Sequence, residues 1–164
     1  MQKAEFWIES LELAPHPEGG YFRETYRSED SYPFGDATPF NGPRAYATAI
    51  YYLLKGKDCS KLHRIHSDEL WFFHAGHPLK VHIFPEAGKA SNFTLGPGKG
   101  QVMQGVVPKE SWFGASLAAP EDEHYALVSC VVAPGFDFQD FAFADRETLQ
   151  KKFPRHTKII ERLT

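Results

Sequence analysis

Apolar residues recur along most of this chain in short runs that fit strands better than helices. From residue 44 onward these runs follow one another closely, and Gly, Pro, Asp or Lys separates nearly all of them. No helix-length segment lies between them to build parallel β–α–β units, so the pattern predicts an antiparallel sandwich, jelly roll or barrel. The predicted strands are 44–54, 60–66, 68–75, 79–84, 91–95, 101–107, 111–117 and 124–133.

The two ends of the chain show a different spacing. Apolar residues between Phe6 and Leu13 recur near helical intervals, and prolines then stop the pattern. A short N-terminal helix is therefore predicted within residues 3–13. Near the other end, Asp145 can cap a helix through residue 153, which Pro154 terminates.

An extended stretch and a long loop connect the N-terminal helix to the first of these strands. Residues 21–27 are extended in character, and the loop over residues 28–43 is rich in Pro, Gly and Asp. Loops of this length are commonly functional, so we interpret this one as a lid or a dimer contact.

Composition supports one domain built mainly from strands. A chain of 164 residues can bury a core but is too short for two well-packed domains, so we expect a single domain over residues 1–164. Aromatic residues make up 15% of the chain, which also has 13 Gly and 12 Pro, and this mixture favours strands and tight turns. Such a chain does not need a disulfide, so Cys59 and Cys130 are expected to be free thiols.

Charge and hydropathy narrow the choice of partners. The net charge is −3, and the longest basic cluster, Lys151-Lys152, is too small to follow a phosphate backbone, so no nucleic-acid partner is expected. No apolar run approaches the roughly 20 residues of a membrane helix, and the first residues lead into an acidic segment rather than a signal-peptide core. We therefore expect a cytoplasmic protein with no membrane partner.

One segment carries a recognisable motif, GKDCSKLHRIHSDELWFFHAG, which runs from Gly56 to Gly76 and contains His63 and Glu69. It resembles the first signature of the cupin superfamily, in which a Gly precedes two His two residues apart, a Glu and a second Gly. Side chains at i and i+2 of a strand point to the same face, so such residues point together into a barrel. With the helical ends, the resemblance implies an all-β fold: a double-stranded β-helix, or cupin jelly-roll barrel, with short N- and C-terminal helices.

Two positions depart from the superfamily's metal-binding pattern. The residue two after His63 is Ile65, and His66, one further, is predicted to face the other side of the strand. In VPKESWFG, which resembles the second signature, an aromatic residue replaces the His. A stable transition-metal site generally has three or four protein donors, so no metal ligand is assigned and the cofactor is left open.

Three further motifs, HPEGGYF from His16, SDELW from Ser67 and APGFDF from Ala133, are similar to those of one uncharacterised cupin subfamily. The likeness runs over nearly the whole chain and implies a homodimer. Aromatic residues and strand edges that would otherwise be exposed also favour association between copies.

A more distant resemblance suggests roles for two residues. The run Gly20 to Glu24, followed later by Leu62-His63, is similar to the sugar-nucleotide 3,5-epimerases of the same superfamily. That resemblance implies that Glu24 holds the substrate and that His63 removes a proton beside a carbonyl. The arginine that precedes the histidine in those enzymes is Ser60 here, and their tyrosine acid falls at Val128.

The remaining candidates follow from alternation along the predicted strands. Glu69 shares a face with Trp71, and its carboxyl either bonds to His63 inside the barrel or contacts a ligand. Arginines on strand-like segments can clamp an anionic ligand, and Arg23 is preferred because its segment also supplies Tyr21. The other candidate ligand contacts are Trp71, on the same face as Glu69, Trp112, which can stack on a flat ligand, and Gln104, which can present an amide.

Three functional hypotheses follow from these residues. The first is a small polar or sugar-like ligand in the barrel and a metal-free, epimerase-like isomerase with His63 or Glu69 as base. The second is a metal-dependent cupin enzyme, a dioxygenase or an isomerase, that uses the same two residues. The third is a ligand-binding or sensor protein with no catalytic activity.

Overall fold

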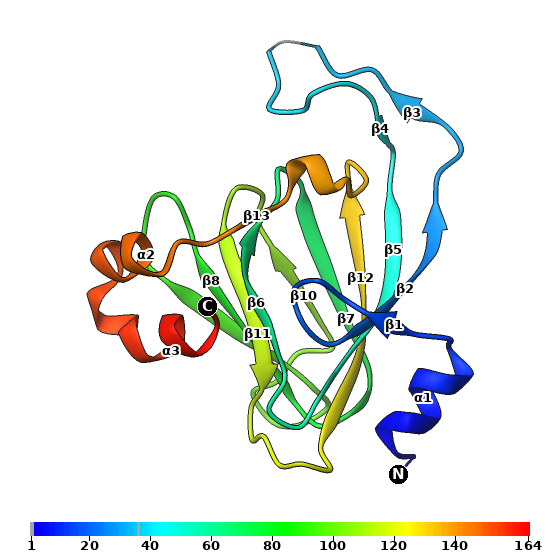
Figure 1. Cartoon of the computed structure of the whole chain (residues 1–164), viewed down its shortest axis with the longest axis vertical. Coiled ribbons are helices and arrows are strands. Elements are labelled where there is room, and N and C mark those ends of the chain that lie inside the picture. The colour runs from blue at the N-terminus through cyan, green and yellow to red at the C-terminus, as the bar shows by residue number, and fades with distance from the viewer. Residues whose placement is uncertain (1, 36) are drawn as a thin grey trace.

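The computed structural model describes residues 2–35 and 37–164, most of which form strands (Figure 1). The strands are β1 (Ala14–Pro15), β2 (Tyr21–Arg27), β3 (Ser31–Tyr32), β4 (Arg44–Ala45), β5 (Thr48–Lys55), β6 (Cys59–Arg64), β7 (Asp68–Gly76), β8 (Leu79–Phe84), β9 (Ser91–Leu95), β10 (Gln104–Val107), β11 (Trp112–Leu117), β12 (Tyr125–Ala133) and β13 (Ala142–Phe143). The helices are α1 (Ala4–Ser10), α2 (Arg146–Lys152) and α3 (Thr157–Arg162), with 3₁₀ turns η1 (Phe138–Asp140) and η2 (Pro154–His156).

Two antiparallel sheets face each other and form the barrel. One has six strands in the order β1-β2-β5-β12-β7-β10, and the other has five in the order β13-β6-β11-β8-β9. This arrangement, with short helices at both ends of the chain, confirms the predicted all-β jelly-roll fold. β3 and β4 pair only with each other and form a hairpin that projects beyond one end of the barrel (Figure 1).

Most predicted elements are present, and the differences lie where elements are short. β2, β8 and β9 begin and end as predicted, and Asp145 caps α2 through the Thr148 N–H. The predicted loop 28–43 contains β3, which pairs with β4, so the predicted strand 44–54 is divided into β4 and β5. The two-residue strands β1 and β13 and the helix α3 were not predicted, because two residues show no period and Pro154 reads as a stop.

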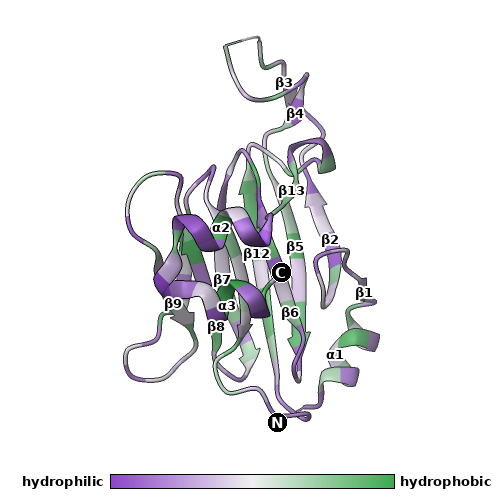
Figure 2. Cartoon of the chain, turned by 60° about the vertical axis from the view of Figure 1, so that its left-hand side comes forward, coloured by the Kyte–Doolittle hydropathy of each residue, from purple (hydrophilic) through white to green (hydrophobic). Residues whose placement is uncertain are grey.

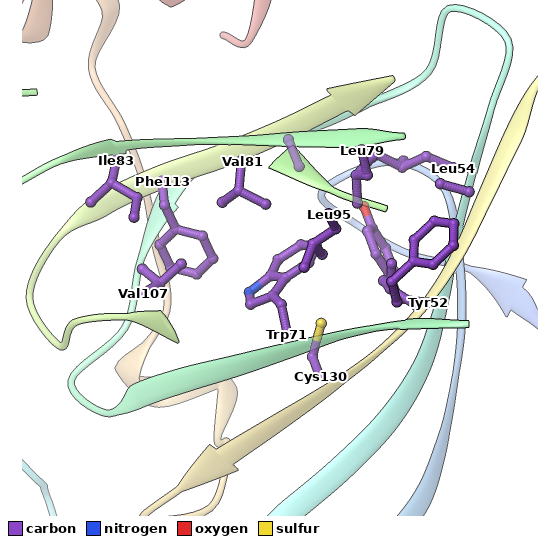
Figure 3. Close-up of a cluster of buried hydrophobic side chains, with 14 of the residues drawn as sticks. Tyr52, Leu54, Trp71, Leu79, Val81, Ile83, Leu95, Val107, Phe113 and Cys130 are labelled. Carbon is purple, nitrogen blue, oxygen red and sulfur yellow. The ribbon is translucent and has the colours of Figure 1, made fainter. Parts of the chain in front are cut away.

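The core lies between the two sheets and follows strand alternation. On β7, Glu69, Trp71 and Phe73 are buried, whereas Asp68 and His74 are exposed. Figure 3 shows Trp71 and Cys130 pointing from one layer toward Val81 of the other. The inward face of β7 that the sequence predicted is thereby confirmed.

The terminal helices cover the outer faces of the sheets. Leu149 of α2 and Ile160 of α3 pack with Leu62 and Phe84 on the five-stranded sheet, across which Figure 2 shows both helices lying. At the other end of the chain, Ala4 of α1 packs with residues of β5 and β12 on the six-stranded sheet. The space between the sheets therefore contains core side chains and, at one end of the barrel, a cavity.

The segment after β12, residues 134–143, crosses the hairpin end of the barrel (Figure 1). A buried ion pair fixes it, in which Arg44 Nε and Nη2 donate to Asp140 at 2.7 and 2.6 Å. The Phe136 N–H donates to Thr48 Oγ1, and Ser67 Oγ donates to the Pro134 carbonyl. These bonds place Phe136 and Phe138 over the end of the barrel.

Two other sequence expectations can be compared with the structure. Cys59 and Cys130 are free thiols, as predicted. Residues 2–35 and 37–164 contain no helix with the length and apolar character that crossing a bilayer requires.

Candidate functional site

A cavity of about 260 Å³ opens at the end of the barrel that residues 134–143 cross. Its wall combines buried carboxyl and imidazole groups with aromatic and aliphatic side chains. The lining residues are His16, Glu18, Phe22, Glu24, Arg27, Thr48, Ile50, Tyr52, His63, Glu69, Cys130, Val132, Phe136, Asp137 and Phe138.

The turn between β1 and β2 places Glu18 in this wall. Gly19 and Gly20 have φ values of +110° and +72°, a region that side-chain-bearing residues rarely adopt. The backbone comes so close to β6 that a Cβ on Gly19 would lie 2.1 Å from the Cys59 carbonyl oxygen. The Lys61 N–H donates to the Glu18 carbonyl at 2.8 Å, and the Glu18 side chain is thereby directed into the barrel.

Glu18 is the direct partner of His63. His63 Nδ1 lies 2.6 Å from the Lys61 carbonyl oxygen, and Nδ1 therefore carries a hydrogen, because a carbonyl can only accept. His63 Nε2 lies 3.1 Å from Glu18 Oε2. Two lone pairs would repel at that distance, so one proton lies between them, on the imidazole or on the carboxyl group. Ser60 Oγ donates to the other Glu18 oxygen at 2.8 Å.

Glu69 has a different protonation state from an ordinary glutamate. Burial, and then repulsion by the Glu18 carboxylate, raise its pKa to about 8, and the Cys130 thiol offsets this slightly. Its carboxyl group is therefore mostly protonated at neutral pH and can donate a hydrogen bond. Burial and the neighbouring Glu69 carboxyl group raise the pKa of the Cys130 thiol well above its usual value, so this thiol is a weak nucleophile.

His16 is held neutral beside this group. The Glu18 N–H donates to His16 Nδ1 at 3.1 Å, so the ring hydrogen is on Nε2. Burial lowers the pKa of His16, and the opposite effect of Glu18 is smaller. The ring packs edge-on against Phe22, with 4.4 Å between the ring centroids.

An ion pair and two phenylalanines line the rest of the wall. Arg27 Nε and Nη2 donate to the two oxygens of Glu24 at 2.9 and 2.7 Å, and Nη2 also donates to the Phe136 carbonyl. Phe136 and Phe138 meet edge to face, with 4.9 Å between their centroids. β2 and the segment that crosses the barrel are thus joined beside the cavity.

The structure gathers three of the eight predicted site residues around this cavity, namely Glu24, His63 and Glu69. The proposition that His63 and Glu69 project together into the barrel agrees with this geometry. Of the two alternatives for Glu69, the internal bond to His63 is absent, because both His63 nitrogens lie against Lys61 and Glu18. The Glu69 carboxyl therefore faces the cavity.

Tyr21 and Arg23 lie on the opposite face of β2 from Phe22 and Glu24, because successive side chains of a strand alternate. Tyr21 packs in the cluster under α1, and Arg23 forms an exposed ion pair with Glu12. Neither side chain lines the cavity.

The other three predicted contacts also lie away from the cavity. Trp71 is buried in the core, where its Nε1 has no hydrogen-bond partner among the described residues. Trp112 faces outward, where it packs in the cluster beneath α2 and α3, with the Arg64 guanidinium 4.6 Å from its ring centroid. Gln104 is exposed on the edge strand β10.

The sequence did not identify His16 and Glu18 as site residues, because both occur only within the HPEGGYF motif and neither matches a ligand or catalytic position of the resemblances. The adjacent Gly19-Gly20 pair was the available signal, since two consecutive glycines indicate a backbone that approaches another segment closely.

The donor set does not fit the metal site that the superfamily resemblance implies. Ile65 is in the apolar core, and Phe113 packs against the His63 ring, with 4.1 Å between the centroids. His66 lies outside the barrel and bonds to Glu110 at 2.7 Å. In residues 2–35 and 37–164, no three His, Cys, Asp or Glu side chains are arranged to hold a metal ion.

Comparison with known proteins identifies relatives over the whole chain. The family model described as Cupin superfamily (DUF985) matches residues 5–144. A curated Saccharomyces cerevisiae protein, the uncharacterized protein YML079W, is 35% identical over 153 residues, which are 85% of this chain and 74% of the yeast protein. A hypothetical protein from Leishmania major has a solved structure with a TM-score of 0.89 and 35% identity, over 99% of each chain. Protein SO0799 from Shewanella oneidensis gives a TM-score of 0.85 and 35% identity, over 100% of this chain and 98% of that one.

A more distant structural match concerns the fold alone. Oxalate decarboxylase from Lactobacillus farciminis gives a TM-score of 0.55 at 16% identity, over 94% of this chain and 42% of that one. At this level of identity the likeness extends to the barrel and not to the residues of a site.

Proposed function

The chain belongs to the cupin superfamily, in the family described as DUF985, and from this premise we propose that its barrel binds a small polar, sugar-like ligand and transfers a proton on it. The reaction class is isomerisation or epimerisation beside a carbonyl. One observation carries the proposal: the His63–Glu18 pair and the protonated Glu69 line the same cavity.

The cavity supports binding by its size and by the variety of its wall. At about 260 Å³ it is near the lower end of ordinary ligand sites, which are roughly 300–1,000 Å³. Phe22, Ile50 and Val132 offer apolar contacts, and the carboxyl and imidazole groups offer directional hydrogen bonds. Convergent polar groups in an apolar cavity are typical of ligand sites.

The two titratable groups have complementary roles in the proposed reaction. The Glu18 carboxylate, positioned by the Nε2–H of His63, accepts a proton from the carbon beside the carbonyl, while Glu69 donates its proton to the carbonyl oxygen, which gives an enediol. Return of a proton to carbon, and of the hydroxyl proton to Glu69, completes the isomerisation without any co-reactant. A carboxyl group with a pKa near the working pH suits this exchange.

The direct test is hydrogen exchange. The chain is incubated in D₂O with trioses, pentoses, hexoses and 6-deoxyhexoses, and deuterium uptake beside the carbonyl is followed by NMR while ligand binding is followed as a shift in Tm. Glu69→Gln keeps a hydrogen-bond donor but has no proton to transfer. It is expected to keep the ligand-induced shift in Tm and to lose exchange by about 100-fold or more.

His63→Gln is expected to lose exchange to a similar extent. Matched controls are Glu86→Gln on the surface and His74→Gln on the outer face of β7, which should exchange at the wild-type rate. A wild-type chain that binds a compound without exchange would show a binding or sensor protein and contradict catalysis. Exchange that needs an added metal ion would favour a metal-dependent enzyme instead.

A further inference from the structure

The charge balance of the cavity carries an inference about the ligand, and it rests on the function proposed above. We propose that the ligand is an uncharged, hydroxylated molecule of about monosaccharide size, and that the site excludes phosphate esters, nucleotide sugars and carboxylic acids. The resemblance to the sugar-nucleotide 3,5-epimerases implies a different ligand, one that carries a nucleotide.

An anion site needs cations or N–H groups that are free to face the ligand. Among the described residues that line the cavity, Arg27 is the one Lys or Arg side chain. Its guanidinium is already bound to both oxygens of Glu24 and to the Phe136 carbonyl. An anionic ligand would have to displace Glu24 or approach Arg27 through Nη1, and in either case the charged Glu24 carboxylate would lie beside it.

The other positive groups of the wall are also occupied. His63 has Glu18 as its partner at 3.1 Å, and His16 is neutral because its Nδ1 accepts the Glu18 N–H. At the start of the short 3₁₀ turn η1, the Gln139 N–H already donates to Asp137 Oδ1 at 2.9 Å, so this N–H group is not available to an anion. Arg27 and His63 therefore both have a carboxylate partner already, which a phosphate or a carboxylate would have to compete with.

Carboxyl groups outnumber cations in the same wall. Four of them line the cavity, at Glu18, Glu24, Glu69 and Asp137, beside the single guanidinium. Glu24 is balanced by Arg27, Glu18 shares a proton with His63, and Glu69 is mostly uncharged at neutral pH, so Asp137 leaves a small negative charge that disfavours an anion. A cationic ligand gains little in return, because Asp137 is the one carboxylate of these four without a cationic or proton-sharing partner in the wall.

What the wall offers is suited to hydroxyl groups on an apolar frame. Glu69 donates, the Glu18 carboxyl accepts, and the faces of Phe22, Phe136 and Phe138 provide apolar contacts for C–H groups. A volume of about 260 Å³ is below that of drug-sized sites. The nucleotide part of a larger molecule would have to extend beyond it.

The experiment uses matched compounds and one charge variant. Hexoses, their 6-phosphates, the corresponding hexuronic acids and 2-amino-2-deoxyhexoses are compared by thermal shift and by NMR titration. The expected result is that the uncharged member of a series binds at least tenfold more tightly than its charged counterparts. Inorganic phosphate is expected to produce no shift in wild-type Tm that an equal concentration of chloride does not.

Glu24→Gln frees Arg27 and is expected to gain at least tenfold in affinity for inorganic phosphate and for the hexose phosphate. The matched control is Glu12→Gln, which frees Arg23 in the same way on the outer face of β2, and it should gain nothing at the cavity. Binding is located by the NMR shifts of cavity residues.

Two results would overturn the inference. One is a wild-type chain that prefers the phosphate, the acid or the amine of a series. The other is a wild-type cavity that binds inorganic phosphate as tightly as the Glu24→Gln variant does. If no compound of any series binds, the proposed function fails, while the phosphate comparison between the two chains still tests the charge balance.

Discussion

Glu69 and His63 line one cavity, but their buried polar groups are stabilised in different ways. His63 Nε2 lies 3.1 Å from Glu18 Oε2, whereas Glu69 forms no ion pair with the described residues and is mostly uncharged at neutral pH because of its burial. An uncharged carboxyl group avoids the large cost of an isolated buried charge. The cost in stability grows as the pH rises above about 4.5, because the unfolded chain then releases a proton that the folded chain still holds.

The first prediction concerns the pH dependence of stability. Between about pH 4.5 and 8 the folded chain holds a proton on Glu69 that the unfolded chain releases, so the free energy of unfolding falls as the pH rises. Glu69→Gln lacks this proton. The difference in free energy of unfolding, wild type minus variant, is expected to fall by on the order of a few kcal/mol from about pH 5 to about pH 8.

Urea denaturation at a series of pH values measures this difference. Glu86→Gln on the surface is the control, and its profile should run parallel to that of the wild type. Parallel profiles for Glu69→Gln would show that its carboxyl group is ionised in the folded protein and would contradict the assigned role as a proton donor.

At the level of elements, the five-residue turn between β1 and β2 has a large effect on the geometry of the site. The turn from His16 to Gly20 supplies two cavity residues, and the Tyr52 hydroxyl donates to the Gly19 carbonyl at 2.7 Å. It lies against β6, the strand that carries His63. The separation of Glu18 from His63 therefore depends on backbone packing at Gly19.

Gly19→Ala is predicted to disrupt this packing. The new Cβ would meet the Cys59 carbonyl oxygen, and the backbone conformation at a φ of +110° is unfavourable for Ala. We expect a loss of more than about 2 kcal/mol in the free energy of unfolding and a loss of ligand binding, because the turn must move away from β6. Guanidinium denaturation and the thermal-shift assay measure the two effects.

Gly42→Ala is the matched control for this change. Gly42 also has a positive φ, +92°, but no atom lies within 4 Å of the position of its Cβ. The loss in the free energy of unfolding for Gly42→Ala should be limited to backbone strain, about 1 kcal/mol, and ligand binding should be unchanged. Equal costs for the two variants would show that the close approach to Cys59 is unimportant.

For the molecule as a whole, the two sheets, the terminal helices and the segment over the barrel end leave one projecting feature. This is the β3–β4 hairpin, where Tyr32 and nearby Tyr46 are 52% and 55% exposed. Edge strand β10 is a second candidate surface, since Met103 and Val106 beside and on it are exposed. Exposed apolar side chains of this kind are typical of contact surfaces.

We predict that the chain forms a homodimer through the hairpin. Sedimentation equilibrium should give twice the 18.6 kDa mass of the chain. The double variant Tyr32→Ser, Tyr46→Ser should shift the equilibrium toward monomer by at least tenfold, and the control Val106→Ser should not. A wild-type monomer at high concentration would contradict the dimer, and a shift with Val106→Ser alone would move the contact to β10.

The sequence by itself determined the longer strands, the inward face of β7 and the presence of His63 and Glu69 in one barrel, because strand alternation is a local property of the backbone. It could not determine which face of β2 is covered, since the two faces of an isolated strand are equivalent until another layer packs on one of them. Only the tertiary structure placed Glu24 at the cavity and Arg23 on the opposite face of β2. It also paired His63 with Glu18, 45 positions earlier in the chain, rather than with Glu69, because the approach of distant segments depends on how the whole barrel closes.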